Sequence, residues 1–206
     1  MKSNRMITFG LVVLCFIACI IVSIIVLTQI SKNEASKEVP KNEIIIYGDY
    51  KCPYCKKVEE RIMPEIKNEY IDTGKTKFKF VNMAFLGKDS IKGSRAGHAV
   101  KNIAPNHFLE FQKRIYNKQP NHEVNWITND LLDKEIDELH ISKKRKYKIK
   151  RDYKTEKSQA WKNAIKDRKL SREKEIEEAP TVFINNKKVE NPYDLKEYKK
   201  VLGTED

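Results

Sequence analysis

The chain has 206 residues, 34% of them charged, and a formal net charge of +12. A chain of this length is long enough to bury its own hydrophobic core, and it suits one ordinary domain with an appendage. The basic balance is typical of a well-solvated surface, and beside a membrane it favours attraction to anionic headgroups and wall polymers.

The N-terminal appendage is an uncharged apolar run of 21 residues from Ile7 to Leu27. A helix of that length spans roughly 30 Å, which is the hydrocarbon thickness of a bilayer. The apolar core of a cleaved signal peptide is shorter, about 7–15 residues. We therefore expect residues 1–31 to form a retained membrane anchor. A lipoprotein signal with Cys19 as the lipidated residue, or cleavage at an unrecognised signal-peptidase site, stays open.

The short tail before the apolar run carries Lys2 and Arg5 and no acidic residue. Basic residues favour the cytoplasmic side of a membrane, so we expect the N-terminus inside and the domain outside. The chain is then a single-pass protein of the cell membrane whose domain faces the extracytoplasmic side, where disulfides persist. Residues 32–42 are polar with one proline and read as a linker.

The first part of the domain, residues 43–87, alternates strand and helix patterns. The β-branched run "EIIIYGDY" predicts a buried strand. Apolar residues at four-residue spacing then predict a helix over residues 52–70, which Pro64 should kink. The alternation of lysine and apolar residues in "KTKFKFVNMAF" predicts a second strand.

Residues 88–170 show helical periodicity throughout, so we expect a helical insertion. Its apolar stripes are core faces: Ala96, Ala99, Val100 and Ile103; Phe108, Phe111 and Ile115; Leu132, Ile136 and Leu139; Ala160, Trp161, Ala164 and Ile165. Trp126 is also expected in the core. The basic run "SKKRKYKIKRDYK" within this part is expected to be a solvated helix face, and on an exported domain it does not indicate nucleic acid. Its best functional use is binding to an anionic membrane or wall surface.

Residues 171–206 return to strand patterns. "APTVFI" predicts a strand, Asn185 and Asn186 a two-residue turn, and "KKVE" the returning strand of a hairpin. A short helix over "NPYDLKEYKKVL" completes the chain. The order of elements predicts an α/β sandwich with a helical insertion.

Two cysteines, Cys52 and Cys55, lie directly after the first strand, and three interpretations are open. A structural zinc site needs four ligands, but the other two cysteines lie in the apolar run and the four histidines are scattered. A buried pair of cysteines without a chemical role would not need to lie at the start of a helix. The third interpretation is a redox pair.

Helix geometry favours the redox interpretation. Residues i and i+3 in a first turn lie on one face, close enough for a disulfide between Cys52 and Cys55. Unpaired N–H groups and the helix dipole stabilise a thiolate at Cys52, and Pro53 suits the first helical position. Cys55, more buried, would attack a mixed disulfide as the resolving thiol.

The segments "EIIIYGDYKCPYCKKVEERIMPEI", "KFKFVNMAFLG" and "APTVFINNKKV" together resemble the DsbA family, most closely its membrane-anchored Gram-positive members. The resemblance covers nearly the whole domain and is specific at its two ends. It implies a thioredoxin-like fold with an inserted helical domain. It also implies an enzyme that oxidises thiols in exported proteins and is reoxidised by a quinone-linked membrane partner of the DsbB type.

The resemblance assigns roles to particular residues. Cys52 is the attacked and attacking sulfur, Cys55 resolves, and Pro180 is expected in cis, presenting the Ala179 backbone to an extended substrate. Pro53 and Tyr54 are expected to contact substrate, and Tyr50 is a further candidate for the substrate groove. No metal and no cofactor are expected.

Two positions depart from the family pattern. Ala179 replaces the threonine or valine that often precedes this proline, a change expected to affect substrate release more than chemistry. Tyr54 carries no positive charge where a histidine can stabilise the reduced thiolate, so the redox potential stays open. A reductase or isomerase on the same fold, and a non-catalytic thioredoxin-like binding module, are the alternative functions.

Overall fold

The computed structural model describes residues 17–24, 40–122 and 124–203, and the chain divides into two compact units, Met1–Val39 and Pro40–Asp206. In the first unit, residues 17–24 are helical with exposed side chains. The rest of the expected anchor, and the linker up to residue 39, lie outside the described residues. Within the described residues, no helix combines the length and apolar character needed to cross a membrane.

The second unit is built on a four-stranded sheet of order β2-β1-β3-β4. The central strand β1 (Asn42–Gly48) pairs in parallel with β2 (Thr76–Asn82) and antiparallel with β3 (Thr181–Ile184). A short strand β4 (Lys187–Lys188) completes the sheet. The β-branched run therefore forms the strand at the centre, where pairing on both sides satisfies its backbone groups.

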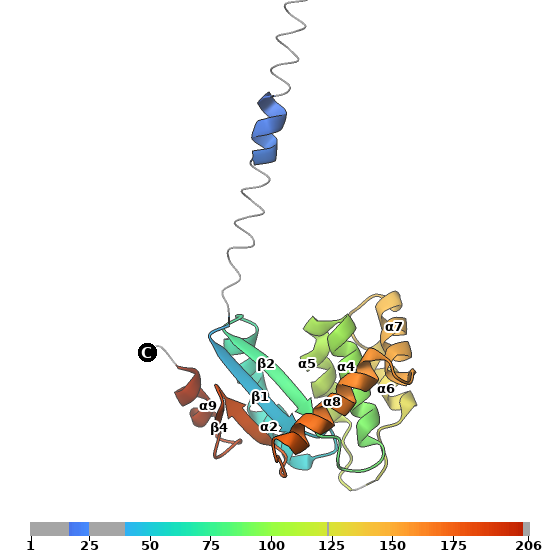
Figure 1. The fold of residues 1–206 in the computed structure, drawn as a ribbon. Coiled ribbons are helices and arrows are strands. Elements are labelled where there is room, and N and C mark those ends of the chain that lie inside the picture. Colours follow the sequence, from blue (N-terminus) through green and yellow to red (C-terminus); the bar gives the residue numbers. More distant parts are fainter. Residues whose placement is uncertain (1–16, 25–39, 123, 204–206) are drawn as a thin grey trace, which may run out of the picture. The chain divides into compact units, whose positions relative to one another are not determined.

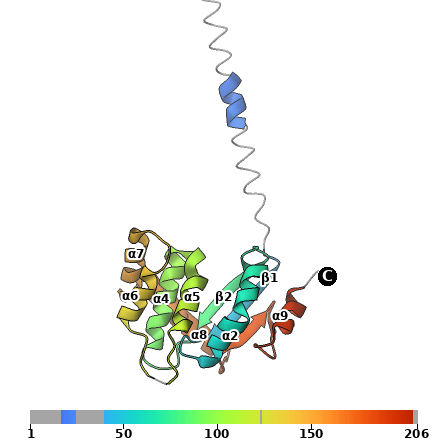
Figure 2. The ribbon, with the colours of Figure 1, turned by 180° about the vertical axis from the view of Figure 1, so that it is seen from behind.

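The two faces of the sheet bury alternate residues of β1, as the two-residue period of a strand requires. Ile44 and Ile46 face the main core together with α2 (Pro53–Arg61) and the C-terminal helix α9 (Leu195–Leu202). Ile45 and Tyr47 face a smaller cluster that includes Leu170 of α8 (Gln159–Glu173). Figure 1 shows α8 in front of the sheet, and Figure 2, from behind, shows α2 in front of it.

The helix expected over residues 52–70 is divided where Pro64 lies. Helix α2 (Pro53–Arg61) is followed by the one-turn helix α3 (Met63–Ile66) and the π-helical turn η1 (Lys67–Ile71). Proline has no N–H to donate to the preceding turn, and this accounts for the break.

Five longer helices separate β2 from β3. They are α4 (Ser90–Ile103), α5 (Phe108–Asn117), α6 (Asn129–Asp137), α7 (Lys143–Lys154) and α8 (Gln159–Glu173), with a 3-10 turn η2 (Pro105–His107) before α5. The expected core position of Ile165 is wrong, because 59% of this residue is exposed. Helix α8 instead buries Ala160, Ala164 and Asp167, a stripe that Ile165 does not join. Trp126 and Trp161 are only half-buried.

The C-terminal part forms the expected hairpin and helix. Asn185 and Asn186 have φ of 51° and 64°, which suits a tight turn between β3 and β4. Helix α9 (Leu195–Leu202) buries Tyr198 and Leu202. All buried core residues lie between residues 44 and 202, so the unit holds its core without the first 39 residues.

Candidate active site

The cysteine pair lies where β1 leads into α2. Cys52 is the N-cap residue of α2, with extended backbone angles, and Pro53 is the first helical residue. The Cys52 sulfur accepts a hydrogen bond from the Cys55 amide at 3.4 Å. Both residues are free thiols and are only 4% and 3% exposed. The structure therefore holds the pair in its reduced form.

The two sulfurs have opposite acidities. The hydrogen bond that Cys55 donates to the Cys52 sulfur lowers the pKa of Cys52 to about 7, burial opposes this, and the backbone N–H groups of Cys55 and Tyr54 assist it. Burial raises the pKa of Cys55 well above its ordinary value. Cys52 is thus the thiol that ionises first, and Cys55 keeps its proton.

The loop before the pair is organised by Asp49, which is fully buried. Its carboxylate accepts four hydrogen bonds, from the amides of Lys51, Phe85 and Leu86 and from the Ser90 hydroxyl, at 2.6–3.0 Å. Its carbonyl accepts from the Cys52 amide at 3.0 Å. One residue therefore joins the end of β1, the segment after β2 and the start of α4.

A second acidic residue joins this loop to the helical segment. Asp89 accepts from the Lys51 ammonium at 2.7 Å and from the Ile127 amide at 3.0 Å. Burial alone would raise the pKa of Asp89, but these hydrogen bonds outweigh it and lower the pKa. Lys51 therefore forms an ion pair with Asp89 and is not a free cation beside the cysteines.

Residues far apart in sequence complete the site. The Ala179–Pro180 peptide bond is cis, as expected. The Cys52 thiol lies 3.3 Å from the Ala179 carbonyl oxygen. The Ala179 backbone therefore lies against the Cys52 sulfur, at the place where the family resemblance predicts that substrate binds.

An open groove of about 690 Å³ adjoins Cys52. Its lining comes from four segments of the chain. These include Pro53 and Tyr54 beside the cysteines, Phe85 and Leu86 after β2, Trp126 in the helical segment, and Ala179 before β3. Tyr54 and Phe85 are 55% and 48% exposed, so the groove offers apolar surface beside the thiol. The sequence had placed Pro53, Tyr54 and Ala179 here. It did not indicate Phe85 and Leu86, whose only signal is that the apolar pattern continues past the end of β2.

Tyr50 does not line this groove, contrary to the expectation. It is 1% exposed and packs between Phe80, at a ring distance of 5.5 Å, and Tyr116, at 5.4 Å. Its side chain points to the core side of the loop and fills the space beside Gly97.

Glu59 is a buried acid one turn beyond Cys55. It is 7% exposed, and its carboxylate accepts from the Gln112 amide at 2.9 Å. Burial raises the pKa of Glu59 to about 7, although the hydrogen bond from Gln112 opposes this. Among the described residues, no group of three or more His, Cys, Asp or Glu could hold a metal ion.

Comparison with known proteins identifies the family. A family model described as Thioredoxin matches residues 37–204. The chain is 33% identical to disulfide bond formation protein D of Bacillus subtilis, over 79% of this chain and 71% of that protein. The crystal structure of oxidised BdbD from Bacillus subtilis matches with a TM-score of 0.71 and 31% identity, over 81% of this chain and 88% of that one.

The chain belongs to the DsbA family of thioredoxin-fold proteins. A probable disulfide bond formation protein D of Bacillus cereus is 30% identical over 100% of this chain and 99% of its own length. The predicted α/β fold, thioredoxin-like with an inserted helical segment, is confirmed. In this DsbA-family chain the cysteine pair occupies the start of the first helix after the central strand.

Proposed function

We propose that this protein is an extracytoplasmic thiol-disulfide oxidoreductase that introduces disulfide bonds into exported proteins through Cys52 and Cys55. The observation that carries the proposal is the position of the Cys52 sulfur, which lies at the start of α2, beside an open groove and 3.3 Å from the Ala179 carbonyl oxygen. The names of its relatives, disulfide bond formation proteins, support the oxidative direction.

The reaction starts from the oxidised pair, in which Cys52 and Cys55 share a disulfide. A substrate thiolate attacks the Cys52 sulfur, the bond to Cys55 breaks, and Cys55 leaves as a thiolate that takes up a proton. A second substrate thiolate then attacks the substrate sulfur of the mixed disulfide, and Cys52 leaves. The substrate gains a disulfide, and its two electrons reside in the reduced pair.

The geometry favours Cys52 as the leaving group of the second step. A thiol of lower pKa leaves faster, and the hydrogen bonds to the Cys52 sulfur stabilise the departing thiolate. Cys52 lines the groove and Cys55 does not, so a substrate in the groove reaches Cys52. An extended substrate segment would pair with the backbone at Ala179, which lines the groove, and pack against Tyr54.

Turnover needs an acceptor for the two electrons. We place this role in a quinone-linked membrane partner of the DsbB type, and we place the protein at the cell membrane, tethered by residues 1–31. The uncharged run of 21 residues supports the tether. Protease treatment of intact cells tests the location. Digestion of residues 40–206 without lysis is expected, and protection until lysis would contradict it.

A reductase is the second candidate, and one observation favours it. A pKa of about 7 at Cys52 is close to that of thioredoxin, about 7, and above that of a strong oxidant such as DsbA, about 3.5. Thiolate stabilisation in the reduced form is what makes a pair oxidising. The potential of the pair therefore decides between the two candidates, since thioredoxin has a potential of about −270 mV and DsbA one of about −120 mV.

Equilibration of residues 40–206 with glutathione buffers separates the two candidates. A potential above about −200 mV supports oxidation of exported proteins, and one near −270 mV supports reduction. Cysteine variants test the site itself. Cys52→Ser should abolish turnover, and Cys55→Ser should accumulate mixed disulfides with substrates. Retained turnover in the Cys52 variant would remove the proposal.

A further inference from the structure

Helix α7 concentrates positive charge more strongly than its neighbours. Its 12 residues, Lys143–Lys154, include eight lysines and arginines and a single acid, Asp152. The 15 residues of α8 hold five basic and two acidic residues. Like charges on neighbouring turns of a helix repel each other, so this concentration of positive charge does not stabilise the helix.

The charges of α7 that face away from the core form a ridge. The helix buries only Ile149 and Tyr153. With 3.6 residues per turn, the opposite side carries Lys144, Tyr147, Lys148 and Arg151, and all four are exposed. We call these four residues the basic ridge.

Two cations that flank the buried face of α7, Lys150 and Lys154, are neutralised, whereas those of the ridge are not. Lys150 pairs with Asp137 at 2.6 Å and Lys154 with Asp133 at 2.5 Å, both acids belonging to α6. In the described part of the chain, no carboxylate lies within salt-bridge distance of the ridge cations Lys144, Lys148 and Arg151. The ridge therefore presents three charges that the fold does not use.

An exposed aromatic ring lies among these charges. Tyr147 is 65% exposed, and the Arg151 guanidinium lies 5.9 Å from the centre of its ring. Tyrosine has an apolar ring and a polar hydroxyl, which suits the headgroup level of a bilayer. Lysine and arginine flanking an aromatic residue is the composition of a surface that lies against anionic lipid.

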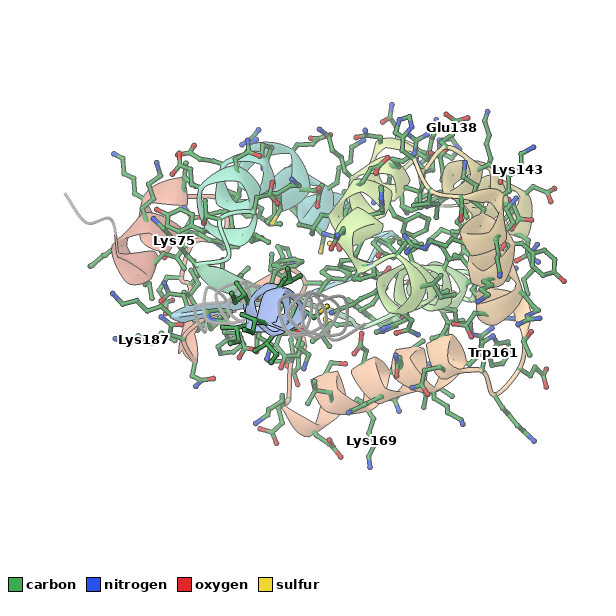
Figure 3. The ribbon with its side chains drawn as sticks, turned by 90° about the horizontal axis from the view of Figure 1, so that it is seen from above. Lys75, Glu138, Lys143, Trp161, Lys169 and Lys187 are labelled. Atoms are coloured by element: carbon green, nitrogen blue, oxygen red, sulfur yellow. The ribbon has the colours of Figure 1, made fainter. Side chains whose placement is uncertain are left out.

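The position of α7 in the unit fits such a surface. Figures 1 and 2 show α7 at the side of the unit that lies away from α9 and β4. Figure 3 shows Lys143 at that outer edge, whereas Lys169 of α8 lies on a different side.

We propose that the basic ridge docks this unit onto an anionic lipid bilayer, with Lys144, Lys148 and Arg151 at headgroup phosphates and Tyr147 at the interface. The inference stands on α7 alone and does not depend on the proposed redox function.

Vesicle binding by residues 40–206 tests the ridge, because this unit holds its own core and lacks the apolar run. The vesicles contain about one third phosphatidylglycerol in phosphatidylcholine, at low salt. The triple variant K144E/K148E/R151E should lower the partition coefficient at least about tenfold. Raising the ionic strength from about 0.02 to 0.5 M should abolish wild-type binding, because exposed charges are screened.

The variant K162E/K166E/K169E is the matched control, with the same spacing on α8, the same change in net charge and three exposed lysines. It should bind within about threefold of the wild type. An equal loss in both triple variants would overturn the proposal in favour of diffuse attraction by net charge. Thermal unfolding of both variants checks that each is folded.

Two further results bear on the lipid assignment. Tyr147→Ser should weaken vesicle binding severalfold without changing net charge, and no effect of this variant would contradict insertion at the interface. Soluble poly(glycerol phosphate) is the competing partner. Tighter ridge-dependent binding to this polymer than to the vesicles would assign the ridge to a wall polymer and overturn the lipid proposal.

Discussion

The Cys52 sulfur lies 3.3 Å from the carbonyl oxygen of Ala179, a residue 127 positions later in the chain. The contact joins the start of α2 to the loop before β3, so the reactive thiol is covered by backbone from the other end of the domain. Its acidity and its access to substrate therefore depend on how the two ends of the sheet pack together.

The stability of the reduced form should depend on pH through Cys52. Its pKa falls from 9.0 to about 7 on folding, so the stabilisation is fully present above pH 9 and is lost as the pH falls through about 7. Urea unfolding of the reduced and oxidised forms should show the reduced form gaining relative stability between pH 7 and 9. Cys52→Ser should remove this gain, and a gain that persists in the variant would contradict the assignment.

Tyr54→His should make the pair more oxidising. A protonated imidazole at this position would stabilise the Cys52 thiolate, lower its pKa further and raise the potential, on the order of 30 mV for one pKa unit. Equilibration with glutathione measures the change. Tyr54→Phe is the control, since it keeps the ring that the Lys57 ammonium contacts at 4.9 Å and adds no charge. Equal potentials in both variants would refute the electrostatic explanation.

Asp49→Ala should destabilise the domain by about 3 kcal/mol or more, because three partly buried amides and the buried Ser90 hydroxyl lose their acceptor, and each unpaired buried group costs about 1–3 kcal/mol. Chemical denaturation measures this. Asp72→Ala, at an exposed acid that pairs with Lys67, is the control and should cost less than about 1 kcal/mol. Similar losses in the two variants would show that the Asp49 hydrogen bonds add little.

Glu59→Gln should stabilise the protein at pH 8 more than at pH 5. Burial raises the folded pKa of Glu59 from 4.5 to about 7, so ionisation costs stability as the pH rises between these values and the cost then stays constant. The variant escapes this cost, and its advantage should grow by on the order of 2 kcal/mol between pH 5 and 8. Unfolding curves at both pH values measure the difference. An advantage independent of pH would contradict the raised pKa.

The Glu59→Gln variant should gain stability in a second way, through the side-chain oxygen of Gln112. In the described residues this buried Oε1 has no hydrogen-bond partner, while Gln112 Nε2 donates to Glu59. A glutamine at position 59 can accept from that Nε2 and donate to the Oε1. Glu59→Met, which removes both possibilities, should lack this part of the stabilisation.

Local features of the sequence were sufficient to predict the cysteine pair and the order of elements. A CxxC directly after a β-branched run predicts a redox pair at a helix start, because capping and the i, i+3 spacing are local properties. Asn185 and Asn186 predicted the hairpin for the same reason, since positive φ favours asparagine there.

Burial was predicted less well, because periodicity shows that a helix has an apolar face but not which neighbour covers it. Ile165 directly follows the buried Ala164 in an apolar pair yet lies in solvent, and Tyr50 flanks the cysteine motif yet fills the core. The carboxylate of Asp49 joins Phe85, which follows β2, to Ser90 of α4, and no spacing rule connects these residues.

By itself, the sequence predicted that Cys52 and Cys55 form a redox pair and that they lie at the start of a helix after a buried strand. Only the tertiary structure decided their surroundings. It placed Ala179 at the Cys52 sulfur, committed Lys51 to Asp89, and added Phe85 and Leu86 to the groove. Helix capping acts within one turn of the chain, whereas these contacts arise from long-range packing, which brings distant segments together only when the whole sheet forms.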